Sequence, residues 1–120
     1  MTSAHDPQLL KGALSLVVLH LLAERESYGY EVVQRLHVLG LDDVLEGTVY
    51  PALARLEREG KISSRLVPSA SGPARKYYVP TAAGRRSLVE GTASWNAFAE
   101  IVTSRLNKVV PKNPAKGDMT

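Results

Sequence analysis

The sequence predicts a mainly α-helical (α+β) domain in which three helices are followed by two short strands and one long helix. Apolar residues recur at helical spacing in three successive segments, residues 9–23, 28–39 and 48–60, and we expect Gly40 and Gly60 to end the second and third of these helices. Two segments rich in strand-forming residues follow, 61–67 and 75–80, with a loop of Pro, Gly and Ser between them. The last periodic segment begins at Thr81 and, over about 28 residues, would extend roughly 40 Å as a helix. This order is that of a winged helix-turn-helix domain with a long C-terminal helix.

Length and composition narrow the class of protein. A chain of 120 residues has room for one domain with a hydrophobic core. It contains no cysteine, which excludes disulfides and thiolate metal sites and suits a reducing compartment. The longest apolar run, residues 14–23, is too short to cross a bilayer, and the N-terminus lacks the basic region of a signal peptide. We therefore expect a cytoplasmic protein that does not enter a membrane.

The charge of the chain is unevenly distributed. Residues 1–60 hold 5 Lys and Arg against 9 Asp and Glu, whereas residues 61–120 hold 10 against 3. The halves therefore carry −4 and +7, which sum to the net charge of +3. A basic half is compatible with a polyanionic partner such as DNA, although many proteins have one for other reasons.

The segment EGTVYPALARLEREGKI at 46–62 predicts a helix with one buried and one functional side. With Thr48 as N-cap, the buried stripe consists of Val49, Ala52, Leu53 and Leu56. Pro51 then falls in the first turn, where its missing N–H removes no intrahelical hydrogen bond. The opposite side carries Thr48, Pro51, Arg55 and Arg58, with Tyr50 on the flank. In helix-turn-helix docking, the N-terminal end of such a helix meets the base edges.

These residue types suit contacts with DNA. Tyr50 can pack on a thymine methyl or a sugar and donate its hydroxyl to a phosphate, and Arg55 can reach a phosphate or a guanine. Thr48 and the first N–H groups of the helix suit a phosphate oxygen. The alternative is a solvated surface on which Arg55 and Arg58 pair with neighbouring glutamates.

The predicted hairpin would form the wing. Arg75 and Lys76 lie where the second strand leaves the loop, a position from which they can follow a phosphate backbone or enter a minor groove. The alternative is a solubilising loop, because charge pairs are usually solvated. Tyr77 and Tyr78 must point to opposite faces of the strand, so we expect one of them to pack inward.

The second helix begins with a tyrosine-rich turn. Ser27 is a candidate N-cap for this helix, and Tyr28 and Tyr30 bracket Gly29 at its start. We expect Tyr30 to pack in the core or on the hairpin, and Tyr28 to be a candidate phosphate contact.

The last helix needs a partner. Its apolar residues follow a nearly heptad rhythm interrupted at Gly91 and Arg105: Leu88, Trp95, Phe98, Val102 and Val109, with Ile101 and Leu106 beside them. A small domain cannot cover this stripe, so we expect a homodimer whose two reading helices lie about 34 Å apart, one turn of DNA. Trp95 is either an anchor of the dimer core or, with Phe98 and Val102 beside it, part of the wall of a ligand cavity.

Enzymatic activity has no support in the sequence. His5, His20 and His37 lack metal-ligand spacing, and the glycines form no phosphate-binding loop, so we expect no metal and no cofactor. The other candidate class is a winged helix that dimerises or senses a ligand without binding DNA.

Four segments together resemble the PadR family of bacterial transcriptional regulators: LLKGALSLVVLHLLA at 9–23, YGYEVVQRL at 28–36, EGTVYPALARLEREGKI at 46–62 and GPARKYYVPTAAGRR at 72–86. The resemblance implies a dimeric winged-helix repressor that binds a roughly palindromic, double-stranded operator. It also implies release by a small and frequently aromatic ligand. Pro80 departs from the pattern, which has an aliphatic residue before the Thr of the last helix.

By this resemblance the DNA-binding residues lie on three elements. The reading helix contributes Thr48, Tyr50, Ala52 and Arg55 beside Pro51, the supporting helix Tyr28 and Gly29, and the wing Arg75 and Lys76. The last helix resembles the short subtype of the family, in which aromatic residues at the positions of Trp95 and Phe98 line a ligand cavity. We accordingly expect a DNA-binding domain over 1–80 (its first helix also meeting the partner), a dimerisation helix over 81–110 and a disordered tail over 111–120.

Overall fold

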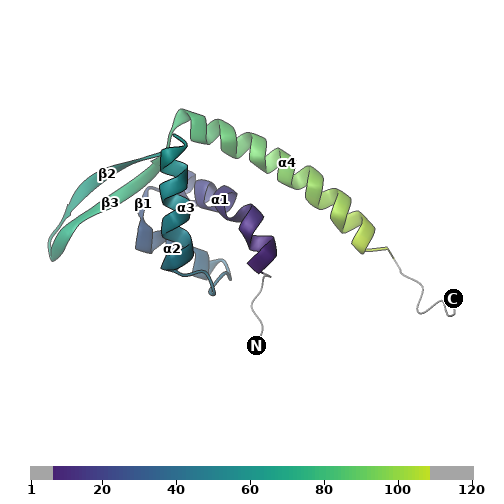
Figure 1. The fold of residues 1–120 in the computed structure, drawn as a ribbon, viewed down its shortest axis with the longest axis horizontal. Coiled ribbons are helices and arrows are strands. Elements are labelled where there is room, and N and C mark those ends of the chain that lie inside the picture. The colour runs from purple at the N-terminus through teal and green to yellow at the C-terminus, as the bar shows by residue number, and fades with distance from the viewer. Residues whose placement is uncertain (1–6, 109–120) are drawn as a thin grey trace.

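The computed structural model describes residues 7–108, so the expected tail at 111–120, like His5 and Val109, lies outside the described residues. Its elements, in chain order, are α1 (Pro7–Glu24), β1 (Ser27–Tyr28), α2 (Gly29–Val38), α3 (Glu46–Arg58), β2 (Ile62–Ser69), β3 (Gly72–Pro80) and α4 (Ala82–Leu106). The three strands form an antiparallel sheet in the order β1-β3-β2. Figure 1 shows the β2–β3 hairpin projecting from one end of the molecule and α4 leaving the other end as a rod. The predicted winged helix-turn-helix fold is confirmed.

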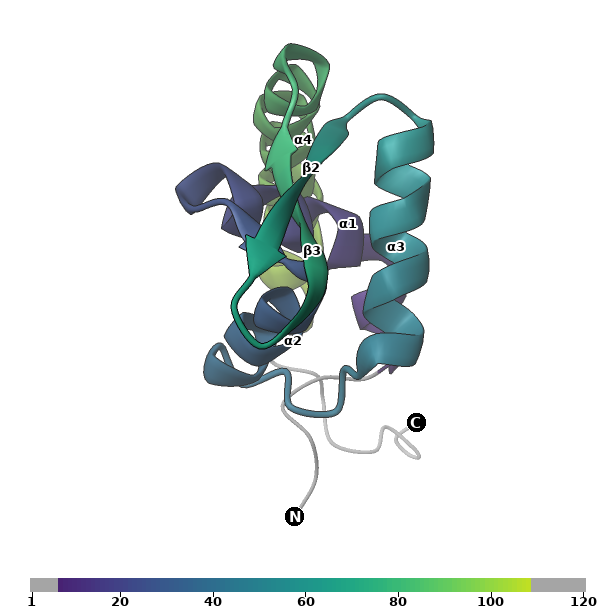
Figure 2. The same cartoon turned by 90° about the vertical axis from the view of Figure 1, so that its left-hand side faces the viewer.

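The core lies where α1, α2 and α3 meet the base of the sheet, as Figure 2 shows from the side of the wing. Its fully buried side chains come from all three helices and β2: Val18, Leu22, Val32, Val33, Leu36, Val49, Leu53, Leu56 and Ile62. Burying each of these contributes about 1.5–3 kcal/mol relative to exposure. The predicted stripe of α3 is therefore correct, with Ala52 partly buried at its edge.

Glycines end α2 and α3 as predicted. Gly40 and Gly60 have φ values of 103° and 75°, the left-handed region that a side chain disfavours. After α3, the Gly60 N–H donates to the Glu57 carbonyl at 3.0 Å and the Lys61 N–H to the Leu56 carbonyl at 2.9 Å. These two bonds satisfy the last carbonyls of the helix and turn the chain sharply into β2.

The start of α3 differs from the prediction. Its N-cap is Leu45 rather than Thr48, because the N–H groups of Thr48 and Val49 donate to the Leu45 carbonyl at 2.9 and 3.1 Å. Pro51 is therefore the sixth residue of the helix and leaves the Gly47 carbonyl without its intrahelical donor.

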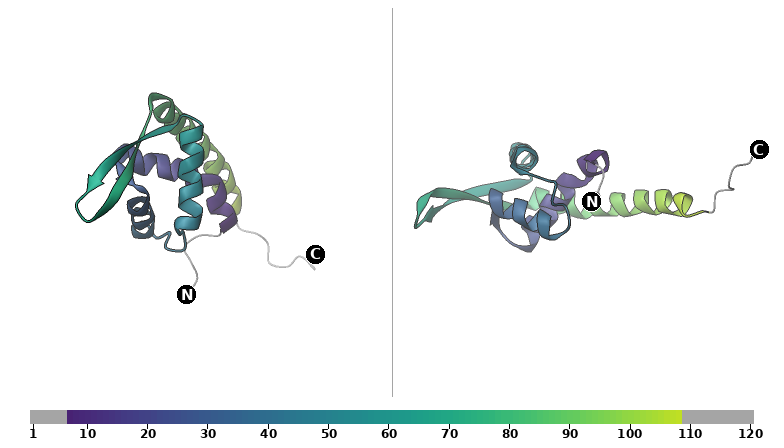
Figure 3. Two further views of the ribbon diagram at one scale, coloured as in Figure 1. Left: turned by 60° about the vertical axis from the view of Figure 1, so that its left-hand side comes forward. Right: turned by 90° about the horizontal axis from the view of Figure 1, so that it is seen from below.

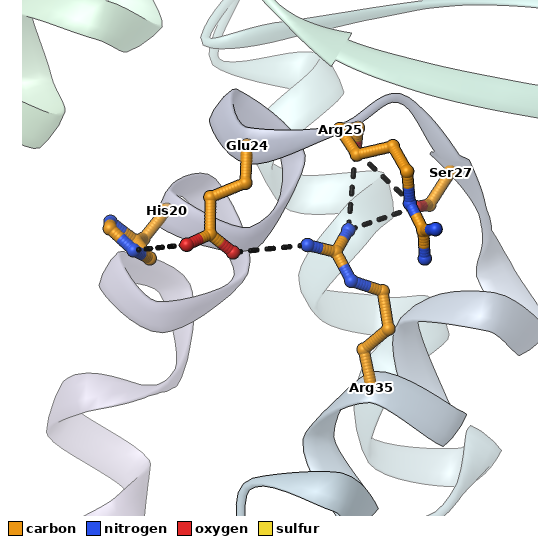
Figure 4. A network of polar contacts seen from close by, with 5 residues as sticks. All are labelled: His20, Glu24, Arg25, Ser27 and Arg35. Atoms are coloured by element: carbon orange, nitrogen blue, oxygen red, sulfur yellow. Dashed lines mark hydrogen bonds and ion pairs between the residues drawn. The ribbon is translucent and has the colours of Figure 1, made fainter.

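Ser27 is also not the cap that the sequence predicted. It is fully buried in β1, and the N-cap of α2 is Tyr28. Figure 4 shows the polar network around it, in which Arg35 of α2 donates to Ser27 Oγ at 3.0 Å, to the Arg25 carbonyl at 3.2 Å and to Glu24 Oε1 at 3.1 Å. Glu24 also contacts His20 at 3.1 Å, so this network fixes the end of α1 against α2.

The wing is longer than predicted, since β2 and β3 extend into the expected loop and leave only residues 70 and 71 between them. Val67 pairs with Arg75 and Leu66 with Lys76, so both basic residues lie within the paired strands rather than beside the loop. Pro68 falls at a register shift between Val67 and Ser69, which is where a strand tolerates a proline. As expected, one tyrosine of the pair points inward: Tyr78 is buried.

A compact joint connects α3 to α4. The Thr81 N–H donates to the Lys61 carbonyl at 3.0 Å and the Thr81 hydroxyl to the Gly60 carbonyl at 2.6 Å. The Thr81 hydroxyl also accepts from the Gly84 N–H at 3.0 Å, so Thr81 is the predicted N-cap of α4. Gly84 is buried against this turn, and a Cβ at Gly84 would overlap the Lys61 carbonyl. Pro80, in register with Ile62, leaves this entry intact.

We expect Gly84→Ala to lower the free energy of unfolding by about 1–3 kcal/mol, because the methyl group must displace backbone atoms. Gly47→Ala is the matched control: its Cβ would meet nothing within 4 Å. Alanine there should stabilise the helix by about 0.5–1 kcal/mol. Urea unfolding of both variants measures these opposite changes in the free energy of unfolding. A Gly84→Ala protein as stable as the wild type would contradict the close packing of Gly84 on the Lys61 carbonyl.

Candidate nucleic-acid interface

The predicted DNA-binding residues fall into two groups on opposite flanks of α3. The first group surrounds a small pocket of about 310 Å³ between α3 and the wing and comprises Tyr28, Gly29, Tyr50, Arg75 and Lys76. The second group lines a groove of about 630 Å³ between α3 and α1 and comprises Thr48, Pro51, Ala52 and Arg55. The structure therefore places the exposed face of α3 between two separate clusters.

Tyr50 lies directly on Gly29. Gly29 is the buried first residue of α2, and a Cβ on it would overlap the Tyr50 ring. Tyr50 remains 44% exposed, so one edge of its ring packs while the rest faces outward. Burial, and then the nearby Glu46 carboxylate, raises the pKa of the Tyr50 phenol. A phenol is protonated at neutral pH even without this shift, so the Tyr50 hydroxyl can donate to a phosphate.

Aromatic contacts link the wing to the start of α2. The Arg75 guanidinium lies 4.5 Å above the centre of the Tyr28 ring. Tyr28 in turn meets Tyr77 edge-on, with 5.3 Å between ring centroids. Tyr30, which we expected to pack, is instead 46% exposed, because the hairpin passes Tyr28 and not Tyr30.

Lys76 connects the wing to α3. Its Nζ donates to Glu57 Oε1 at 3.1 Å, and Glu57 Oε2 accepts from the Ser64 hydroxyl of β2 at 2.7 Å. Hydrogen bonds from Ser64 and then Lys76 hold the pKa of Glu57 below its usual value. The sequence did not single out Glu57 or Ser64, because only the strand register, which pairs Ser64 with Tyr78, brings them together.

Arg55 points towards α1. Its guanidinium donates to the Ser15 hydroxyl at 3.0 Å. Within residues 7–108 neither Arg55 nor Arg58 forms an ion pair, since Glu57 contacts Lys76 and Glu59 contacts Lys61 at 3.5 Å. The alternative in which these arginines pair with neighbouring glutamates is therefore not what the structure contains.

The aromatic residues of α4 line a different site. Trp95 and Phe98, 44% and 61% exposed, line a groove of about 480 Å³ together with Leu16 of α1 and Arg55. Val102 does not reach it and lies further along the rod, beside Ile101 and Leu106. We expected Gly91 only to interrupt the heptad rhythm of apolar residues. It also lets α4 approach α1, because a Cβ at this position would lie 2.8 Å from Leu16 Cδ1.

No group of metal-ligating side chains occurs among residues 7–108. In the same range, no helix has the length and apolar character needed to cross a membrane. His20 contacts Glu24, and His37 contacts the Val44 carbonyl at 2.7 Å.

A helix with an exposed face, supported by a second helix and flanked by a basic β-hairpin, defines the winged helix-turn-helix class of DNA-binding proteins. The chain matches the model of the transcriptional regulator PadR-like family over residues 18–90. It belongs to this family, as its motifs suggested. It is therefore a regulator of transcription, and DNA binding follows from that membership.

Individual relatives agree with this assignment. The transcriptional regulator Rv3488 of Mycobacterium tuberculosis is 40% identical over 94 residues, which cover 77% of this chain and 84% of that protein. A PadR-like regulator of Bacillus cereus has a TM-score of 0.77 at 37% identity, covering 85% of this chain and 99% of that one. A PadR family regulator of Eggerthella lenta has a TM-score of 0.77 at 34% identity, covering 86% and 89%. All three of these relatives are transcriptional regulators.

We expect Gly29→Ala to weaken DNA binding about tenfold or more, because the new methyl group displaces the Tyr50 ring and a side-chain contact to DNA is worth about 1–3 kcal/mol. In a Tyr50→Ala background the same substitution should cost little, since the space is then empty. Fluorescence anisotropy with promoter DNA measures all four proteins of this cycle. Additive losses would show that Gly29 does not act through Tyr50.

Proposed function

We propose that this regulator is a cytoplasmic homodimer that represses transcription from a pseudo-palindromic operator and is released from it by a small, aromatic ligand. The observation that carries the proposal is the surface of α3. Its exposed side is bordered by Tyr50 and the basic wing on one flank and by Arg55 on the other. Cations on both flanks of one helix suit a DNA duplex, because a helix in the major groove has a phosphate backbone on each side.

The polar groups of this surface suit the two kinds of DNA contact. Thr48, Pro51 and Ala52 lie in the N-terminal half of α3, the half that meets base edges in helix-turn-helix complexes. Tyr50, Arg75 and Lys76 supply a phenol and two cations for the backbone. We therefore assign base reading to the first turns of α3 and backbone binding to its flanks.

A second copy of the chain is the natural cover for α4. Its large apolar side chains are exposed along most of its length: Val89 (70%), Trp95 (44%), Phe98 (61%), Ile101 (70%) and Leu106 (73%). Exposed apolar surface of this extent on a helix usually marks a contact with another molecule. Pairing two rods around a two-fold axis would present two copies of α3 to successive turns of DNA.

The groove beside Trp95 supports ligand control. A volume of about 480 Å³ is within the range of small-molecule sites, and two aromatic walls favour a flat ring. The groove also touches Arg55, so a ligand held there would contact the reading helix directly. The competing role for Trp95 and Phe98 is packing in the dimer core alone.

A winged helix without DNA binding remains the rival class. DNA binding is not needed to explain one exposed phenol, but that class does not account for cations on both flanks of α3. Salt-dependent binding of promoter DNA separates the two classes.

We expect Tyr50→Ala and Arg55→Ala each to weaken binding to the protein's own promoter region by about tenfold or more, because each removes a contact worth about 1–3 kcal/mol. Mobility shifts at rising salt measure this loss, and the wild type should show a steep salt dependence. Light scattering should give a dimer mass for all three proteins. Lone protomers at micromolar concentration, or a flat salt response with intact dimers, would contradict the proposal.

Aromatic compounds should quench Trp95 fluorescence saturably, and the effective ones should release promoter DNA at matching concentrations. Trp95 is the chain's only tryptophan, so its emission reports this groove alone. Phe98→Ala should weaken ligand binding, while the other exposed apolar side chains of α4 should keep the mass that of a dimer. If no compound releases DNA while Phe98→Ala dissociates the dimer, these aromatics serve only to pack the interface.

A further inference from the structure

A second cluster of cations lies on the side of α3 away from the wing. The α1–α3 groove is lined by Lys11, Arg55 and Arg58, with the hydroxyls of Ser15 and Thr48 between them. Lys11, on α1, was not among the residues predicted from the sequence. Its side chain is exposed, and within residues 7–108 it forms no ion pair. Among residues 7–108, three cations therefore border one groove whose lining contains a single carboxylate, that of Asp43.

We propose that this groove is a second phosphate-binding site for operator DNA and that Lys11 is its principal contact from α1. The proposal rests on the DNA binding proposed above and adds a site, and a residue, to it.

The dimensions of DNA support this placement. The major groove is about 12 Å wide, and an α-helix with its side chains is about 10–12 Å across, so a docked helix has one phosphate backbone against each flank. The wing supplies Arg75 and Lys76 to one flank of α3. The opposite flank faces the α1–α3 groove, so the second backbone would pass Lys11 and Arg55.

The arrangement of the helices agrees with this docking. In Figure 3 (right), α3 and the N-terminal end of α1 project on the same side of the molecule, whereas α4 runs at a different level. Duplex DNA approaching α3 would therefore meet the end of α1 that carries Lys11, and α4 would not obstruct it.

The hydrogen bond between Arg55 and Ser15 assigns Arg55 a role within this site. A guanidinium held at 3.0 Å from a hydroxyl of α1 is directed towards the groove and away from the exposed centre of α3. Its remaining N–H groups can bind a phosphate oxygen. Arg55 is accordingly a backbone contact here, and base reading falls to residues nearer the start of α3.

Replacing Asp43 should change the affinity for DNA in the opposite direction to replacing Lys11. Its exposed carboxylate lines the same groove and repels a phosphate there. Neutralising Asp43 should therefore strengthen binding, whereas removing Lys11 should weaken it.

Lys11→Ala should lower affinity for the promoter duplex roughly 3–10-fold near 0.1 M salt and reduce the slope of log K against log salt by about one. Lys11→Gln, which keeps most of the aliphatic stem, should show the same loss of slope. Asp43→Asn should raise affinity. Lys108→Ala, which removes an exposed lysine after the end of α4, should change neither affinity nor slope. Anisotropy titrations over a salt series measure all four.

Neutral backbone substitutions can locate the contact. Single phosphates of the duplex are replaced one at a time by a neutral methylphosphonate. At one position the replacement should weaken DNA binding by the wild type but cause no further loss of affinity in Lys11→Ala. That position should lie on the strand opposite the one identified in the same way with Arg75→Ala.

The outcomes separate this site from the function on which it rests. If Tyr50→Ala and Arg75→Ala lose binding while Lys11→Ala keeps the wild-type affinity and slope, the site is wrong and the regulator stands. If Lys11→Ala changes the mass of the dimer but not the salt slope, the groove holds the partner chain and the site is again overturned. If the wild type binds no promoter DNA with salt dependence, the proposed function itself fails.

Discussion

The structure depends on one constraint: α3 must be buried along one side and open along the other, so whatever orients it has to act from its flanks and its ends. The buried side of α3, with Val49 and Leu53, fixes how closely the helix packs on the core. It does not fix the rotation or the tilt of the helix, because apolar contacts are not directional. The directional contacts come from three other elements. Lys76 and Ser64 of the wing bind Glu57, Ser15 of α1 binds Arg55, and Thr81 binds the turn that ends α3.

The contact with Thr81 differs from the other two in a way that matters for regulation. It involves backbone atoms of Gly60 and Lys61, and buried Gly84 leaves it no room to shift. Side-chain contacts such as Lys76 to Glu57 can break and re-form with little cost at an exposed position. A movement of α4 would therefore be expected to shift α3 as a rigid body, whereas the contacts of the wing can adjust separately. A ligand in the groove beside Trp95 that shifted α4 would therefore change the position of α3 more readily than its shape.

The sequence predicted what local periodicity determines. The order of elements, the buried stripe of α3, the glycine termini and the Thr81 cap all follow from residues within one or two turns of each other. It failed at one local turn, before α3, and at places where a distant segment determines the structure. Thr48 has the chemistry of an N-cap, yet the turn before it places Leu45 in that role. The wing is longer because pairing with β2 outweighs the Gly and Pro of the expected loop. No sequence spacing connects Lys11 with Arg58, because the packing of α1 on α3 creates that groove.

The fold brings charged residues of the acidic and basic halves of the chain together. Carboxylates of the acidic half are paired with cations of the basic half: Glu26 with Arg65, Glu57 with Lys76 and Glu59 with Lys61. Exposed pairs of this kind contribute little stability, so their main effect is on the electrostatic field. They neutralise acidic groups close to α3 and its wing, where a phosphate backbone would otherwise be repelled. Within residues 7–108, Arg55 and Arg58 form no such pair, and their charge remains available at the surface of α3. A chain of net charge only +3 can in this way present a locally cationic face, because the fold decides which charges cancel.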